Sequence, residues 1–385
     1  MNASMGRKSK KEFTKNPGSY DVMLMVSVIL LVGMGLLMVA SSSMMMSERI
    51  HHEVFYFLYH QLILLALGVA CLLLATQIPI SFFSRISPLL LLLAFFLLML
   101  VLIPGIGRTV NGSRRWLSLG FVSLQASEVA KLFFVLYLAS YMERHRMALQ
   151  TSLLGFLKPL GLVMGLCVLL LLEPDFGTSV VLLVTSFGML FVGGVRLRYF
   201  LVILLAGLAG FSLIAISSPY RLERLTTFLH PWANAFGSGY QLTQSLIAFG
   251  RGGLLGVGLG NSIQKLFYLP EAHTDFLVAV IAEEMGLVGV LCIIGLFALL
   301  ITRIFIISRN AFKEQLFFSG YAALGMGIWL SFQALVNLGV NAGLFPTKGL
   351  TLPFMSYGGS SILINCIVIG ILLRMDGEMR GTLPS

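Results

Sequence analysis

The chain has 385 residues, of which 57% are hydrophobic and 11% are charged, and its formal net charge is +10 at pH 7. A soluble core could not bury so much apolar surface, so the composition excludes an ordinary soluble protein and predicts a membrane protein. The basic excess is explained by the anionic inner leaflet, and no nucleic-acid partner is expected. The four cysteines lie in separate apolar runs without ligand-like spacing, which predicts small hydrophobic residues rather than disulfides or metal ligands.

Ten apolar stretches are long enough, or nearly so, to cross a bilayer as helices. In chain order they cover residues 22–40, 55–75, 88–103, 129–142, 159–172, 178–195, 199–216, 276–301, 316–338 and 356–373. The first stretch follows a polar tail and is too long for a cleavable signal. We therefore expect an all-α polytopic membrane protein of about ten transmembrane helices, with a large extracytoplasmic loop between the seventh and the eighth.

Lysine and arginine are concentrated in the N-terminal tail and in the loops that an even number of spans separates from it. Because cytoplasmic loops carry an excess of Lys and Arg, this distribution places both termini in the cytoplasm. The predicted organisation has three parts. They are a basic cytoplasmic tail over 1–21, a single transmembrane domain over 22–375 that includes the large outer loop 217–274, and a cytoplasmic tail over 376–385.

The loop after the third stretch carries Arg108, Arg114 and Arg115 on the outer side, where topology disfavours positive charge. A bound anion is one explanation, because arginine forks match phosphate oxygens, and lipid headgroups are the other. Just downstream, Glu128 and Lys131 lie three residues apart and share one helix face. We expect these two to pair as a support for the arginine loop rather than to take part in chemistry.

The long outer loop contains a glycine-rich stretch over 250–260, around Arg251. No predicted strand precedes it and the Walker lysine is missing, so we reject a nucleotide-binding loop. Glycines at this density instead allow the backbone to approach a ligand or another helix closely. The apolar positions of the loop predict helices that lie on the membrane surface.

The outer loop ends in Asp275, at the head of an apolar helix, where a carboxylate is costly unless it is solvated, paired or functional. Asp275 is therefore the first candidate for chemistry. The segment 337–361 places two prolines and a Gly-Gly pair between apolar helices, and such backbone is tolerated near membrane depth only where protein buries it or a wet cavity adjoins it. Lys348 lies within this segment. A lysine among helix-breaking residues favours an anion-binding segment over a plain re-entrant turn.

Several of these segments carry the sequence blocks of one known family. In chain order the blocks are Arg115-Trp116, Gln125 with Ser127-Glu128 and Lys131, Glu173-Pro-Asp-Phe-Gly-Thr178, Pro270-Glu-Ala-His-Thr-Asp275, and Asn337 with Gly343-Leu-Phe-Pro-Thr and Ser356-Tyr-Gly-Gly-Ser-Ser361. The whole chain resembles the FtsW/RodA/SpoVE family of polytopic cell-wall synthases. Residues 241–251 and 260–265 resemble the division branch, FtsW, more than RodA. Ala126 and Phe267 depart from the family pattern, so no role is carried over to Phe267.

The resemblance implies a bacterial inner-membrane glycosyltransferase that polymerises lipid II into peptidoglycan strands during cell division, with 217–274 as a periplasmic loop. It also implies that Asp275 matches the family's catalytic aspartate, acting as a general base while undecaprenyl pyrophosphate leaves. The residues expected to bind pyrophosphate and sugar are Lys348, Arg114, Arg115, Arg224, Arg251, Lys265 and Ser356. Those expected to support the site are Glu128, Lys131, Trp116, His273, Gly358 and Gly359.

The resemblance further implies a class B penicillin-binding transpeptidase of the FtsI type and other division proteins as partners, besides lipid II and membrane lipids. The sequence requires no cofactor, and it leaves open a divalent cation, Mg²⁺ or Mn²⁺, at the pyrophosphate. Two alternatives stay open, a lipid II flippase and an elongation-type polymerase like RodA. The enzyme is favoured over the flippase because four of the predicted helices carry almost no ionisable group at mid-span, whereas a flippase needs a polar path that also opens inward.

Overall fold

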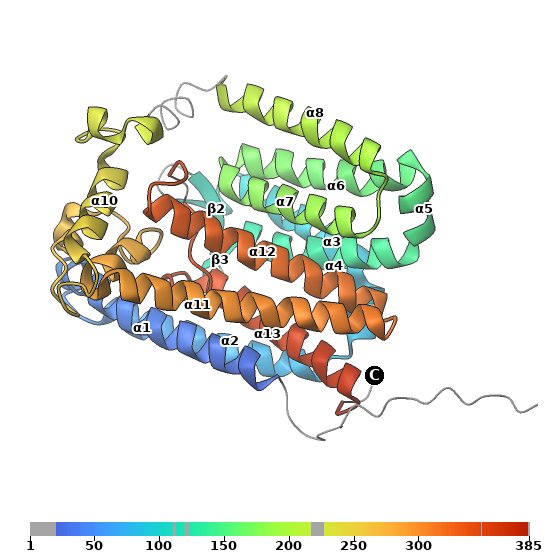
Figure 1. The fold of residues 1–385 in the computed structure, drawn as a ribbon, viewed down its shortest axis with the longest axis horizontal. Coiled ribbons are helices and arrows are strands. Elements are labelled where there is room, and N and C mark those ends of the chain that lie inside the picture. Colours follow the sequence, from blue (N-terminus) through green and yellow to red (C-terminus); the bar gives the residue numbers. More distant parts are fainter. Residues whose placement is uncertain are drawn as a thin grey trace, which may run out of the picture.

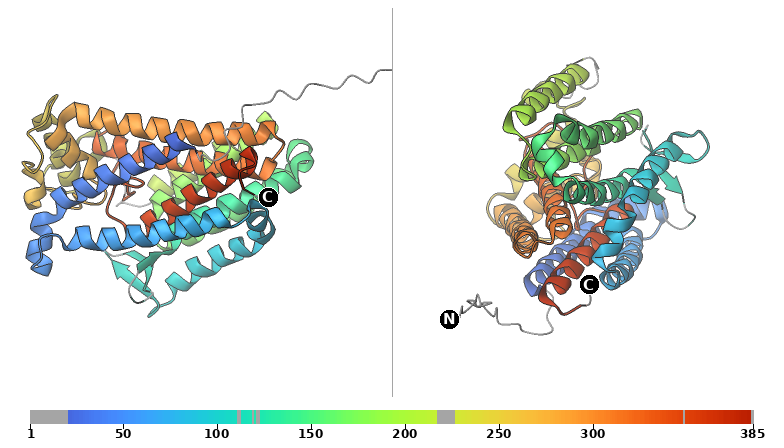
Figure 2. Two further views of the ribbon diagram at one scale, coloured as in Figure 1. Left: turned by 90° about the horizontal axis from the view of Figure 1, so that it is seen from below. Right: turned by 90° about the vertical axis from the view of Figure 1, so that its right-hand side faces the viewer.

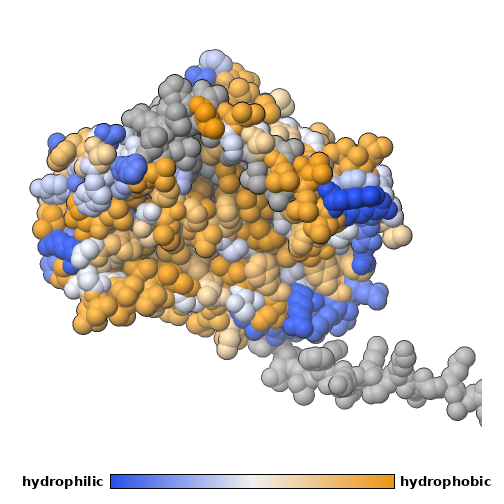
Figure 3. Space-filling model, turned by 45° about the horizontal axis from the view of Figure 1, so that its top comes forward, coloured by the Kyte–Doolittle hydropathy of each residue, from blue (hydrophilic) through white to orange (hydrophobic). Residues whose placement is uncertain are grey.

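The computed structural model describes residues 21–110, 113–118, 120, 123–216, 227–347 and 349–383. Its long helices lie side by side along one axis and form a bundle (Figures 1 and 2). The face drawn in Figure 3 is apolar across the middle, with hydrophilic residues gathered towards both ends. Within the described ranges, seven helices are long and apolar enough to cross a membrane, and α7 is a shorter apolar helix. The chain is therefore a multi-pass membrane protein.

Each of the ten predicted stretches falls mainly on one long helix. These helices are α1 (Val22–His51), α2 (Tyr56–Gln77), α3 (Ile80–Leu102), α4 (Ala126–Arg144), α6 (Leu153–Leu172), α7 (Phe176–Val192), α8 (Leu197–Ile216), α11 (Leu277–Lys313), α12 (Phe317–Asn341) and α13 (Gly359–Arg380). The shorter helices are α5 (Arg146–Thr151), η1 (Pro231–Asn234), α10 (Tyr240–Gly252) and η2 (Gln264–Tyr268). Ten membrane crossings stay a prediction, since seven helices meet both the length and the hydropathy requirement.

A small antiparallel sheet replaces the loop that we expected after α3. Its strands β1 (Gly107–Val110), β2 (Ser113–Ser118) and β3 (Ser123–Gln125) lie in chain order, with Trp116 opposite both Arg108 and Gln125. The strands are only three to six residues long. The fold is thus mainly helical rather than strictly all-α, because segments this short carry too few residues for a periodic signal.

The helices pack closely where small residues face a neighbour. α13 lies along α2, α11 along α12 and α1, and α3 along α4. At the α2–α13 contact, a β-carbon added at Gly370 would lie 2.6 Å from the carbonyl oxygen of Leu72, so only glycine allows this approach. Almost every residue in the first four turns of α4 is buried, which places Glu128 and Lys131 inside the protein.

Helix α11 is interrupted at Gly286, whose φ of 65° and ψ of −163° are not helical. The carbonyl oxygens of Glu283 and Glu284 accept hydrogen bonds from the backbone of 257–258, both at 3.0 Å, instead of from their own helix. In return Leu287 donates to the carbonyl oxygen of Gly253. A β-carbon at Gly252 or Gly256 would collide with the carbonyl oxygen of Ala282 or Glu284, respectively. The predicted close approach of the glycine-rich stretch is confirmed, and its partner is the backbone of α11.

Candidate active site

Asp275 lies two residues before α11, as predicted, where the outer loop joins the helix. Its side chain is partly exposed, and its backbone carbonyl accepts hydrogen bonds from Asn337 Nδ2 at 3.0 Å and from Asn341 Nδ2 at 2.9 Å. A β-carbon added at Gly349 would lie 3.0 Å from Asp275 Oδ2. The carboxylate therefore lies against the segment that follows α12. The predicted cation Lys348 lies outside the residues that the structure describes, as does Arg224.

The residues just before Asp275 are fixed by the chain that enters α13. The backbone N–H of Tyr357 donates to the carbonyl oxygen of His273 at 3.0 Å. The His273 ring is buried, with its centroid 4.9 Å from that of Phe57 and 5.6 Å from that of Tyr357. This burial lowers the pKa of His273, while Glu271 opposes the shift. These ring contacts agree with the supporting role predicted for His273. The lowered pKa favours the neutral form of its ring.

The predicted pair of Glu128 and Lys131 is present, with Lys131 Nζ 2.7 Å from Glu128 Oε1. Lys131 Nζ also donates to Gln333 Oε1 at 2.9 Å and lies 4.7 Å from the centroid of the Trp329 ring. Gln333 in turn donates to the carbonyl oxygen of Thr351 at 2.9 Å. The pair therefore joins α4 to α12 and, through Gln333, to the segment that lies against Asp275. Among the described residues, the hydrogen bonds of the pair run to α12 and not to β2, the strand that carries Arg114 and Arg115.

The two predicted arginines of β2 contact backbone carbonyl groups. Arg114 Nη1 donates to Leu102 at the end of α3, at 3.2 Å. Arg115 donates to the carbonyl oxygens of Glu173 and Pro174, at 3.2 Å and 2.6 Å, and its Nη1 lies 4.0 Å from Asp175 Oδ1. Trp116 lies on β2, the central strand between β1 and β3, and is half-buried. Arg115 is thus held at the turn between α6 and α7, where it can still present part of its guanidinium to an anion.

Glu173 is a notable acid that the sequence analysis left without a role. It is 1% exposed, and neither of its carboxylate oxygens has a hydrogen-bond partner among the described residues. Burial raises the pKa of Glu173 to about 8; the charge of Asp175 adds to the shift, and Arg115 opposes it. The sequence does carry a signal for Glu173, because two acids close together at the end of an apolar stretch cannot both ionise without a large cost in free energy.

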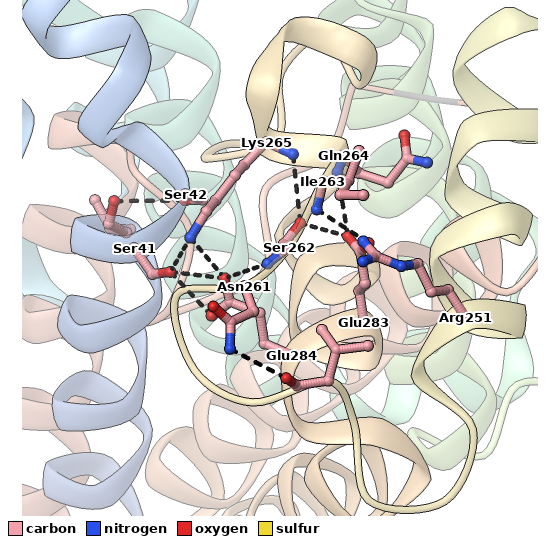
Figure 4. Close-up of polar contacts among 12 residues, drawn as sticks. Ser41, Ser42, Arg251, Asn261, Ser262, Ile263, Gln264, Lys265, Glu283 and Glu284 are labelled. Atoms are coloured by element: carbon pink, nitrogen blue, oxygen red, sulfur yellow. Dashed lines mark hydrogen bonds and ion pairs between the residues drawn. The ribbon is translucent and has the colours of Figure 1, made fainter.

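The predicted cations Arg251 and Lys265 lie in ion pairs with buried carboxylates around the interruption of α11 (Figure 4). Arg251 Nη1 lies 2.5 Å from Glu283 Oε1, and Lys265 Nζ lies 2.9 Å from Glu284 Oε1. Ser41 of α1 donates to both oxygens of Glu284, at 2.8 Å and 2.9 Å. An anionic ligand would have to compete with these carboxylates, so both cations serve first to hold the outer loop on α11. Glu283 and Glu284 were not predicted as site residues, although adjacent acids in an apolar helix are a signal in themselves.

The predicted residues within 356–359, around the start of α13, make structural contacts. Ser356 is buried, and its hydroxyl accepts a hydrogen bond from the backbone of Leu352 at 2.9 Å. A β-carbon at Gly359 would lie 2.7 Å from the Leu64 side chain, which supports the role predicted for this glycine. Gly358 has an extended backbone at the start of α13. The substrate role of Ser356 stays a prediction.

The fold and the site define a multi-pass membrane protein with a partly exposed acid, Asp275, just before an interrupted helix. The sequence pattern of the FtsW/RodA/SpoVE family, described as "Cell cycle protein", matches residues 21–381. The chain belongs to this family.

Several relatives with assigned names are similar over nearly their whole length. A "Probable peptidoglycan glycosyltransferase FtsW" of Coxiella burnetii is 56% identical over 360 residues, which cover 94% of this chain and 97% of the relative. The protein with the same name from Legionella pneumophila is 53% identical over 361 residues, covering 94% and 92%.

Solved structures show the same fold. A chain of a complex described under "Structural coordination of polymerization and crosslinking by a peptidoglycan synthase complex" matches with a TM-score of 0.77 and 29% identity, covering 94% of this chain and 98% of that one. The crystal structure of the rod shape determining protein RodA of Thermus thermophilus matches with a TM-score of 0.69 and 30% identity, covering 93% and 97%.

Proposed function

We propose that the chain is a peptidoglycan glycosyltransferase that polymerises lipid II into glycan strands during cell division. The observation that carries the proposal is the placement of Asp275, a partly exposed acid held at the outer end of α11 and against Gly349. The relatives with assigned names support the reaction, and they favour the division branch over the elongation branch. The Coxiella FtsW is 56% identical to this chain, whereas the Thermus RodA is 30% identical.

In the proposed reaction, Asp275 accepts the proton of the 4-hydroxyl on the acceptor's N-acetylglucosamine. That oxygen forms a bond to the anomeric carbon of the donor's N-acetylmuramic acid with inversion. The bond from this carbon to the phosphate oxygen breaks, and undecaprenyl pyrophosphate leaves with the electron pair. Pyrophosphate is a good leaving group, so one carboxylate suffices where most glycosidases need two. Lys348, Arg114 and Arg115 are proposed to balance the charge that develops on the leaving group.

A divalent cation at the pyrophosphate stays an open prediction, and the sequence requires no cofactor. In the described part of the chain, no three His, Cys, Asp or Glu side chains lie together as metal ligands would. Mg²⁺ commonly takes only one or two protein carboxylates, the rest of its shell being water and substrate phosphate. The described residues form no complete metal site of their own, so a cation at this place would be held mainly by substrate phosphate and water.

We also propose a cellular location and a partner for this chain. The chain is proposed to lie in the bacterial inner membrane at the division septum with both termini in the cytoplasm. Figure 1 supports the orientation, because α10 lies at one end of the bundle while α5 and the described C-terminal end lie at the other. The likeness to a chain of a peptidoglycan synthase complex supports a class B penicillin-binding transpeptidase as partner.

Polymerisation by purified protein tests the proposal. Asp275→Asn should abolish glycan polymer from labelled lipid II, with and without the partner transpeptidase, because asparagine is nearly isosteric but cannot act as a base. Lipid II binding and the melting temperature should stay close to wild type. Glu314→Gln is the matched control, because this exposed acid lies at the far end of α11 and should keep full activity. Wild-type polymer yield from a well-folded Asp275→Asn protein would overturn the mechanism.

A further inference from the structure

Asp275 lies just before the N-cap residue of α11, Phe276, so its carbonyl is outside the regular hydrogen bonds of the helix. The N–H of Ala279, in the first helical turn, likewise has no regular acceptor within the helix. Ala279 instead donates to the carbonyl oxygen of Phe276 and to Asn341 Oδ1, both at 3.1 Å. The Asp275 carbonyl accepts from Asn341 Nδ2 at 2.9 Å. The side-chain amide of Asn341 is thus inserted between the two backbone groups.

Asn337 lies one turn before Asn341 on α12 and adds a second link. Its Nδ2 donates to the carbonyl oxygens of both Asp275 and Leu350, at 3.0 Å and 2.6 Å. One amide therefore joins the chain at Asp275 to the chain that follows Gly349. Asn341 Nδ2 also donates to the backbone carbonyl of Asn337 at 2.9 Å. The two asparagines are 2% and 0% exposed, so their amides are fixed on all sides by protein.

These contacts enclose Asp275 from two directions. α12 holds its backbone through the two asparagines, and Gly349 lies close enough that a β-carbon there would approach Asp275 Oδ2 to 3.0 Å. Because one amide of Asn337 binds both the Asp275 and the Leu350 carbonyl groups, it ties the two segments to the same point on α12. The contacts with α12 and with the segment at Gly349 therefore fix both the backbone position of Asp275 and the space available to its carboxylate.

We propose that Asn337 and Asn341 are positioning residues, which hold the Asp275 backbone just before the first turn of α11 and so aim its carboxylate at the acceptor hydroxyl. This inference rests on the proposed function of Asp275. Positioning matters for rate because a shift of the reacting group by about 1 Å costs on the order of 10²-fold. An alternative role, in which the two amides only join α12 to α11, would affect stability and leave turnover of the folded protein unchanged.

The test compares three asparagine-to-leucine variants of the full chain, which replace a buried amide with an apolar group of similar size. Asn337→Leu and Asn341→Leu should each lower kcat for lipid II polymerisation by on the order of 10²-fold, with KM changed less than about threefold. Asn365→Leu is the matched control. Asn365 is 1% exposed on α13, and its Nδ2 donates to Ser361 Oγ at 3.3 Å, away from Asp275. This variant should keep the wild-type kcat.

Gly349→Ala provides a second test that removes no hydrogen bond. The added methyl group would press on Asp275 Oδ2 from the opposite side, so kcat should fall at least several-fold while the melting temperature stays at the wild-type value. Asp275→Asn is measured in parallel. If it polymerises normally, the proposed function fails.

If Asp275→Asn is inactive, but the asparagine variants and Gly349→Ala keep kcat within about twofold of Asn365→Leu, the positioning role is overturned and the proposed function stands. Should the two asparagine variants fail to fold, Gly349→Ala decides, and a normal kcat for it overturns the role.

Discussion

Removing the charge of Lys131 should destabilise the protein strongly. Its ammonium lies 2.7 Å from Glu128 Oε1, and the two side chains are 2% and 6% exposed. Glu128 Oε2 already lacks a hydrogen-bond partner among the described residues. Lys131→Met would leave this carboxylate buried without its cation, which costs about 3–5 kcal/mol. Loss of the contact with the Trp329 ring, at 4.7 Å, would add about 0.5–2 kcal/mol.

The double variant Glu128→Gln with Lys131→Met should recover most of the loss, because it removes both buried charges. Thermal unfolding in detergent of the wild type, both single variants and the double variant gives the coupling free energy between the two residues. A double variant that is more stable than either single variant requires a coupling larger than the larger single loss, so we expect a coupling above about 3 kcal/mol. Polymer yield from lipid II, measured on the same four proteins, should follow stability.

Two outcomes would refute this reasoning. Losses that simply add in the double variant would show that the two charges do not stabilise each other. A double variant as stable as wild type but unable to make polymer would move one of the two residues from support into the reaction. In that case the contact from Lys131 to Gln333, at 2.9 Å, would become the route to examine, because Gln333 holds Thr351.

Three further predictions concern groups around the site. Because the folded-state pKa of Glu173 is about 8 and its ordinary value is 4.5, stability should fall by about 5 kcal/mol as pH rises between these values. Glu173→Gln should flatten the melting temperature across this range, and an unchanged slope would contradict the assignment. The pKa of His273 is lowered, so stability should fall as pH drops below 6.5, and His273→Gln should reduce that loss. Gly256→Ala should lower the melting temperature more than Gly253→Ala, since both have positive φ but only Gly256 would collide with the Glu284 carbonyl; equal losses would argue against this contact.

Features encoded by neighbouring residues were predictable from the sequence. The long helices follow from the length of the apolar stretches, because a bilayer accepts only backbone that satisfies its own hydrogen bonds. Asp275 stood out because the change from polar loop to apolar helix is local. The pair of Glu128 and Lys131 followed from a spacing of three residues. The glycine-rich stretch predicted a close approach, since it depends only on the missing side chains.

Tertiary structure decided which distant groups meet these residues. The sequence could not show that Arg251 and Lys265 would pair with Glu283 and Glu284 of α11, or that the glycines would take the place of a helical turn there. It also gave no sign that the amide of Asn341 would accept a hydrogen bond from the N–H of Ala279, in the first turn of α11, because the two residues lie 62 positions apart in the chain. Charge, size and period belong to the chain itself, whereas the partner of a buried polar group is fixed only when separate helices pack and each group must find a hydrogen bond.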